Sequence, residues 1–77
     1  MSIEKTVIEC AAQAYGVPAD KITPATVVRE ELSNQSMKMV VFISGIEDEL
    51  DVSIDLRDAA KLITIGDFIE KVKQMAQ

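Results

Sequence analysis

The chain has 77 residues, enough for one modest hydrophobic core, and we expect residues 1–77 to form a single domain. It contains no histidine and one cysteine, which excludes an intramolecular disulfide and a thiolate metal cluster, so we expect no bound metal. The formal net charge of −5 disfavours binding to nucleic acid phosphates and insertion into anionic membrane surfaces.

The first predicted helix runs from about Ile3 to Tyr15, because its apolar residues follow helical spacing. Ser2 is its expected N-cap, and Gly16 is the expected residue just past its C-terminus. Cys10 lies on this apolar stripe and is interpreted as a small buried residue. The N-terminus shows no apolar signal core and no window approaches 18 apolar residues, so we expect a cytoplasmic protein.

Residues 17–35 are predicted to form a long loop, since proline, threonine, serine and asparagine interrupt any periodicity. A structureless loop of this length is unusual in a small domain unless it packs or functions. We expect its apolar residues to anchor it over the core; they are Val17, Ile22, Val27, Val28 and Leu32.

The second helix is predicted from Ser36 to Leu50, with a core face that includes Val40. Additional apolar side chains in its first two turns exceed what one buried stripe requires, so part of this surface is expected either to be deeply buried or to meet a partner. Acidic residues gather at its C-terminal end, against the helix dipole, which hints at a binding role.

A brief helix from about Leu56 to Lys61 and a last helix beginning near Thr64 complete the chain. Thr64 is a good N-cap with Asp67 three residues further on. No strand pattern or repeat is present, so the predicted fold is all-α: a small four-helix bundle of three longer helices and one short one.

Ser36 stands where the polar loop meets the apolar second helix. Taken alone, a serine at this position is usually a helix cap. The first turn of a helix also offers unpaired N–H groups and the positive end of the dipole, which favour an attached anion. Because the chain has no histidine, an external enzyme would have to activate the hydroxyl.

The run from Glu31 to Met37, followed by an apolar helix with an acidic end, resembles the attachment motif of the acyl carrier proteins. The segments Tyr15-Gly16-Val17 and Ile63-Thr64-Ile65 are similar to that family's landmarks at the end of the first helix and the start of the last. The resemblance covers nearly the whole chain.

The resemblance implies that Ser36 carries 4′-phosphopantetheine, donated by coenzyme A through a phosphopantetheinyl transferase, and that the arm's thiol holds an acyl or aminoacyl group. It implies a non-catalytic, monomeric carrier whose partners are acyl-transferring, condensing or ligase enzymes with basic patches. The implied partner-binding residues are Met37, Val41, Glu47 and Asp48.

The chain departs from the family pattern at four positions around the serine. Ser33 replaces the motif glycine, Gln35 replaces an aspartate, Lys38 stands where an acid is common, and Val41 stands where fatty-acid carriers have glutamate. These departures favour a carrier dedicated to polyketide, lipid-modifying or aminoacyl-transfer chemistry over one for housekeeping fatty-acid synthesis. The alternative is that Arg29 and Lys38 are incidental surface charges.

The alternative function is an unmodified acidic helical adaptor. Residues 29–58 hold eight acids and three bases, so the whole excess negative charge lies there. Such a segment attracts proteins with basic surfaces, although acids also simply keep a small domain soluble. An enzyme is the least supported class, because no catalytic or phosphate-cradling pattern is present.

Overall fold

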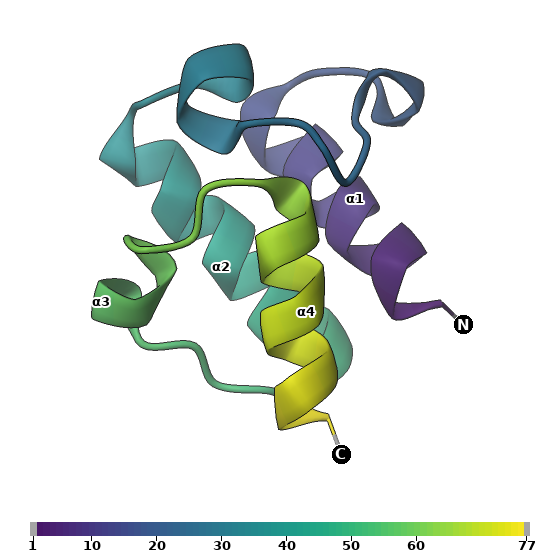
Figure 1. The fold of residues 1–77 in the computed structure, drawn as a ribbon, viewed down its shortest axis with the longest axis vertical. Coiled ribbons are helices and arrows are strands. Elements are labelled where there is room, and N and C mark those ends of the chain that lie inside the picture. Colours follow the sequence, from purple (N-terminus) through teal and green to yellow (C-terminus); the bar gives the residue numbers. More distant parts are fainter. Residues whose placement is uncertain (1, 77) are drawn as a thin grey trace.

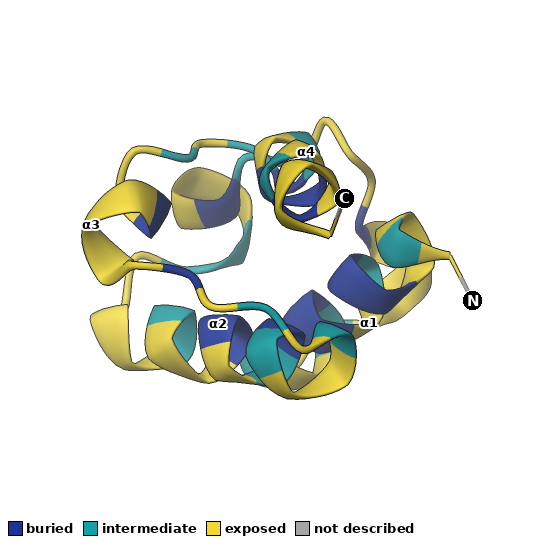
Figure 2. Cartoon of the chain, turned by 90° about the horizontal axis from the view of Figure 1, so that it is seen from below, coloured by how far each residue is buried: buried dark blue, intermediate teal, exposed yellow. Residues whose placement is uncertain are grey.

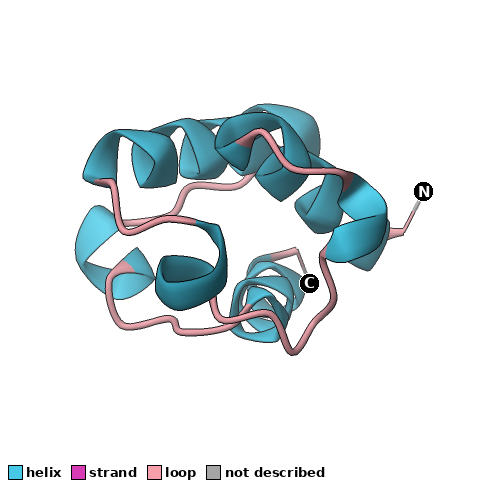
Figure 3. Cartoon of the chain, turned by 90° about the horizontal axis from the view of Figure 1, so that it is seen from above, coloured by secondary structure: helices cyan, strands magenta, loops and turns pink. Residues whose placement is uncertain are grey.

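The computed structural model describes residues 2–76, and four α-helices account for most of them (Figure 1). The helices are α1 (Ile3–Tyr15), α2 (Ser36–Leu50), α3 (Leu56–Ala59) and α4 (Ile65–Met75). Figure 3 shows these residues as helices and loops without any strand. One isolated antiparallel bridge joins Val27 and Thr64. The predicted all-α bundle of three longer helices and one short helix is confirmed.

Both ends of α1 and the start of α4 follow the capping chemistry expected from the sequence. The Ser2 hydroxyl accepts a hydrogen bond from the N–H of Lys5 at 3.2 Å, and Gly16 ends α1 in the left-handed region at φ 69°. Thr64 and Asp67 form a reciprocal capping box at the start of α4. These caps satisfy backbone groups that have no partner within their helix.

The third helix is shorter than predicted, because it ends at Ala59 rather than Lys61. The chain tightens there into bonds that span three residues, from Lys61 N–H to the Asp58 carbonyl at 3.1 Å and from Leu62 N–H to the Ala59 carbonyl at 3.1 Å. Such tightening is common in the last turn of a helix.

The segment between α1 and α2 is more ordered than the predicted loop. It contains a 3₁₀ turn at Ala19–Lys21 and a π-helical turn at Val28–Leu32, here called η2. The N–H of Ser33 donates to the Val28 carbonyl at 3.0 Å, the five-residue spacing that defines a π turn. The predicted anchoring is confirmed, since Ile22 and Val28 are buried and the other three apolar residues are half-buried.

Two backbone hydrogen bonds tie this segment to the start of α4. Ile65 N–H donates to the Thr26 carbonyl at 2.9 Å, and Gly66 N–H donates to the Pro24 carbonyl at 2.8 Å. A Cβ at residue 66 would lie 3.0 Å from the Pro24 oxygen, so glycine permits this close approach. The segment is thereby held across the bundle before it reaches Ser36.

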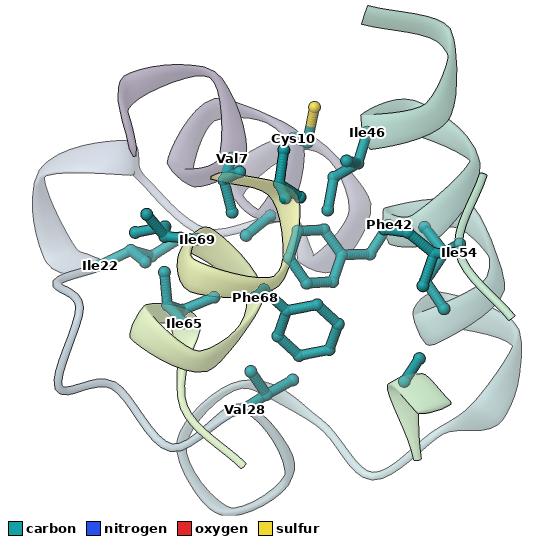
Figure 4. Close-up of a cluster of buried hydrophobic side chains, with 14 of the residues drawn as sticks. Val7, Cys10, Ile22, Val28, Phe42, Ile46, Ile54, Ile65, Phe68 and Ile69 are labelled. Atoms are coloured by element: carbon teal, nitrogen blue, oxygen red, sulfur yellow. The ribbon is translucent and has the colours of Figure 1, made fainter. Parts of the chain in front are cut away.

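An aromatic series links three helices through the core. The ring centroid of Phe42 on α2 lies 5.8 Å from that of Tyr15 on α1 and 4.9 Å from that of Phe68 on α4. Figure 4 shows Phe42 and Phe68 among aliphatic side chains from the other elements, and Figure 2 shows the buried faces of the helices turned inward. This packing fixes the orientation of α2 and hence of the residue that begins it.

Candidate functional site

Ser36 is the first residue of α2 and its side chain is exposed. The cap position belongs to Gln35, whose carbonyl accepts hydrogen bonds from Lys38 N–H at 3.2 Å and Met39 N–H at 3.3 Å. No side-chain cap is formed at this end of the helix. The alternative in which Ser36 acts as an N-cap is therefore wrong, and its hydroxyl is left for other chemistry.

The electrostatic setting of Ser36 suits an attached anion. The first turn of α2 contains no acidic residue, and the half-buried Lys38 adds a positive charge there. Unpaired N–H groups and the positive end of the helix dipole act in the same direction. A phosphodiester on the hydroxyl would thus be stabilised rather than repelled.

The residue that replaces the motif glycine does not distort the turn before Ser36. Ser33 has extended backbone angles, φ −174° and ψ 149°, which any residue adopts. Its hydroxyl accepts a hydrogen bond from Gln35 N–H at 3.1 Å, which stabilises the turn. The departure from the family motif is therefore compatible with the same placement of the serine.

A pocket of about 410 Å³ opens beside Ser36. Its wall from η2 to α2 is polar, whereas Met39, Val40 and Leu56 give the remainder an apolar character. The complete lining is Arg29, Ser33, Asn34, Gln35, Ser36, Met39, Val40, Leu56 and Ala60. A polar rim beside an apolar wall fits an arm that begins with a phosphate and ends in an apolar cargo.

Val40 belongs to this pocket and not to the core, where the sequence analysis placed it. Its side chain is 41% exposed, because it lies one turn after Ser36 on the flank of α2 that faces the pocket. Leu56, at the start of α3, is 55% exposed on the same pocket. Both apolar side chains are thus left open to solvent at the site.

Three of the four predicted partner-binding residues share one face of α2. Met37, Val41 and Asp48 are four and seven residues apart, which places them on one outward stripe. Met37 is 77% exposed and Val41 is 55% exposed. Glu47 does not join this stripe, since it is half-buried and accepts a hydrogen bond from Ile54 N–H at 2.8 Å.

A larger groove of about 890 Å³ lies between α1 and α2, away from Ser36. Val41 and Asp48 border it, together with Cys10 and Glu49. Burial, and then the negative charges of Glu49 and Glu9, raise the pKa of the Cys10 thiol above its ordinary value. The thiol is therefore a poor nucleophile in this setting, and the interpretation of Cys10 as a small buried residue is confirmed.

Two pocket residues, Arg29 and Leu56, were not predicted as site residues from the sequence. Arg29 Nη2 donates to the Ala60 carbonyl at 3.3 Å, so it reaches from η2 to the end of α3. Neither residue carries a periodic signal, because η2 and α3 are too short to show one. The exposed leucine directly after the Asp55 cap was the one available indication.

Neither a metal-binding cluster nor a membrane-spanning helix is found among the described residues. Residues 2–76 contain no group of three or more His, Cys, Asp or Glu side chains arranged to hold a metal ion. Among the same residues, no helix has the length and apolar character needed to cross a bilayer.

Comparison with known proteins shows the family of the chain. Residues 5–72 match a family model described as a phosphopantetheine attachment site. An acyl carrier protein from Desulforapulum autotrophicum is 32% identical over 75 residues, which cover 96% of this chain and 97% of that protein. Acyl carrier proteins from Nitratidesulfovibrio vulgaris (32% over 72 residues, covering 94% and 95%) and Exiguobacterium sp. (28% over 65 residues, covering 84% and 82%) are also similar. The chain belongs to the acyl carrier proteins, which are carriers rather than catalysts and bear a covalently attached 4′-phosphopantetheine.

Proposed function

We propose that Ser36 is the attachment site and that the chain carries an acyl or aminoacyl group as a thioester on the arm. The observation that carries this proposal is an exposed serine at the N-terminus of α2, beside a pocket of about 410 Å³. This serine does not cap the helix. The thiol of the arm supplies the thioester chemistry when the arm is present.

Loading requires the Ser36 oxygen to form a bond to the phosphorus of coenzyme A that bears the pantetheine. The pyrophosphate bond breaks, adenosine 3′,5′-bisphosphate leaves, and the hydroxyl proton passes to a base of the transferase. The pocket beside Ser36 offers no base, since the chain has no histidine and no carboxylate lines the pocket. What it supplies is a fixed hydroxyl and a helix N-terminus that stabilises the new phosphodiester.

Intact mass measurement tests the attachment site. Wild-type protein is incubated with coenzyme A and a broad-specificity phosphopantetheinyl transferase, alongside Ser36→Ala and Ser44→Ala. Ser44 is the matched control because it is an exposed serine on the same helix. We expect wild type and Ser44→Ala each to gain one phosphopantetheine and Ser36→Ala to gain none; an arm on the Ser36 variant would refute the assignment.

We further propose that the partners are enzymes of a dedicated pathway (polyketide, lipid-modifying or aminoacyl-transfer) rather than the housekeeping fatty-acid enzymes. The first turns of α2 present Met37 and Val41 to solvent, with Lys38 half-buried beside them. Asp48 on the same stripe, and the part of Glu47 that remains exposed, would meet basic patches on the partner. The monomeric state and cytoplasmic location expected from the sequence stay predictions.

A reversion experiment tests the choice of partner. The triple variant Gln35→Asp, Lys38→Asp, Val41→Glu restores the acids that fatty-acid carriers have at these positions. We expect holo wild type to be a poor substrate for fatty-acid elongation enzymes and the holo triple variant to be a better one. Efficient elongation on the wild-type protein would overturn the proposal of a dedicated pathway.

A further inference from the structure

We propose that Arg29 binds the phosphodiester of the arm attached to Ser36 and so holds the start of the arm in the pocket. The inference rests on the proposed attachment at Ser36. It concerns the chain's own recognition of its prosthetic group, which the family assignment does not specify.

The charge of the pocket favours an anion. Arg29 is the one cationic residue of the lining, and none of the other eight lining residues is acidic. The two ion pairs formed within residues 2–76 join Arg57 to Asp55 and Lys71 to Asp58, so Arg29 is engaged in neither. Its positive charge is thus not neutralised by a carboxylate at the site.

The guanidinium is also positioned before any anion arrives. Arg29 Nη2 donates to the Ala60 carbonyl at 3.3 Å, which spans from η2 to the end of α3. This bond uses one of the five N–H donors of a guanidinium, and the other donors remain for a phosphate. Since the Ala60 carbonyl already restrains the long side chain, less rotamer entropy is lost when the phosphate binds.

The charge of Arg29 also acts on a residue next to the pocket. Burial raises the pKa of Tyr15, and the positive charge of Arg29 opposes that rise. The Tyr15 hydroxyl donates to the sulfur of Met39 at 4.0 Å, and Met39 lines the pocket.

Phosphorus NMR of the loaded protein tests the inference directly. Holo wild type is compared with holo Arg29→Gln and with holo Arg57→Gln, whose arginine side chain is 92% exposed on α3. We expect wild type and Arg57→Gln to share one ³¹P chemical shift and Arg29→Gln to move toward the shift of a phosphopantetheinyl peptide. Loading should also raise the melting temperature, by about 2–4 °C less in Arg29→Gln than in the other two proteins.

The outcomes separate this inference from the proposed function. If intact mass shows no arm on wild-type Ser36, the attachment proposal fails. The arm can be present while all three proteins share the same ³¹P shift and the same rise in melting temperature on loading. In that case Arg29 does not bind the phosphodiester and the inference is overturned. The ³¹P shifts of wild type and Arg29→Gln could instead differ only when the arm carries a succinyl group and agree when its thiol is free. Arg29 would then bind a carboxylate of the cargo, and the inference would also be overturned.

Discussion

Glu47, near the end of α2, accepts a hydrogen bond from the backbone N–H of Ile54 through Oε2 at 2.8 Å. The bond joins α2 to the connection that leads into α3, and Ile54 itself is buried. A carboxylate at this end of a helix opposes the dipole, so its position needs a compensating contact. Glu47, which was expected to meet a partner, thus also helps to position α3. Leu56 lies at the start of α3, beside the pocket.

We therefore expect Glu47→Ala to destabilise the fold. Removal of a charge-assisted bond to a partly buried N–H costs about 1–2 kcal/mol of unfolding free energy. The matched control is Asp48→Ala, which removes a neighbouring exposed acid and should change stability by less than about 0.5 kcal/mol. Urea unfolding measures both, and equal stabilities would show that the Glu47 bond contributes nothing in solution.

Ser36→Ala is expected to leave the stability of the apo-protein almost unchanged. The hydroxyl is exposed and caps nothing, and alanine is a better helix former than serine. Unfolding of apo-proteins by urea should give free energies within about 0.5 kcal/mol of each other. A large destabilisation would contradict the finding that Gln35, and not Ser36, is the cap.

The long helices could be predicted from the sequence because their apolar residues follow helical spacing. Both ends of α1 and of α2 lie where the apolar spacing and Gly16 placed them. The π turn at η2 could not be predicted, since five residues show no period and its register depends on the bond from Ser33 to Val28. Short elements take their form from tertiary contacts rather than from their own pattern.

The candidate site was predicted only along α2 for the same reason. Met37, Val41 and Asp48 share a face that helical spacing alone defines. The opposite wall of the pocket comes from Arg29 and Leu56, far apart in sequence and brought together by the packing of short segments. Val40 was wrongly predicted to lie in the core. An apolar residue on the flank of a helix can be distinguished from a core residue only when the position of the neighbouring helix is known.

The capping box of α4 predicts a dependence of stability on pH. Hydrogen bonds from the N–H groups of Thr64 and Ile63 hold the pKa of Asp67 below its ordinary value. A carboxyl whose pKa is lowered by folding contributes stability above its unfolded pKa, near 4, and loses that contribution as pH falls through the folded value.

Asp67→Ala should therefore be less stable than wild type near neutral pH, and the difference should shrink below about pH 4. Thr64→Ala is the comparison, because its hydroxyl does not titrate and contributes the smallest of the effects that lower the Asp67 pKa; its loss should cost about 1 kcal/mol near neutral pH and depend less on pH than the loss of Asp67. Thermal unfolding at the two pH values measures both effects. If the difference in stability between wild type and Asp67→Ala does not change with pH, the Asp67 carboxylate does not stabilise the fold through these hydrogen bonds.

The two thiols of the loaded carrier are expected to differ sharply in reactivity. The thiolate is the reactive form of a thiol. Cys10 is 8% exposed, and burial together with Glu49 and Glu9 raises the pKa of its thiol, which keeps the thiol protonated near neutral pH. The thiol of the arm would extend from the exposed Ser36 and escape both effects.

A thiol reagent should therefore react rapidly with no thiol in native apo-protein and with one thiol in holo-protein. After denaturation, one further thiol should react in each protein. The variant Cys10→Ala should keep the fast site of the holo form and lose the slow one, whereas modification of Cys10 in native apo-protein as fast as in denaturant would show that the thiol is not protected.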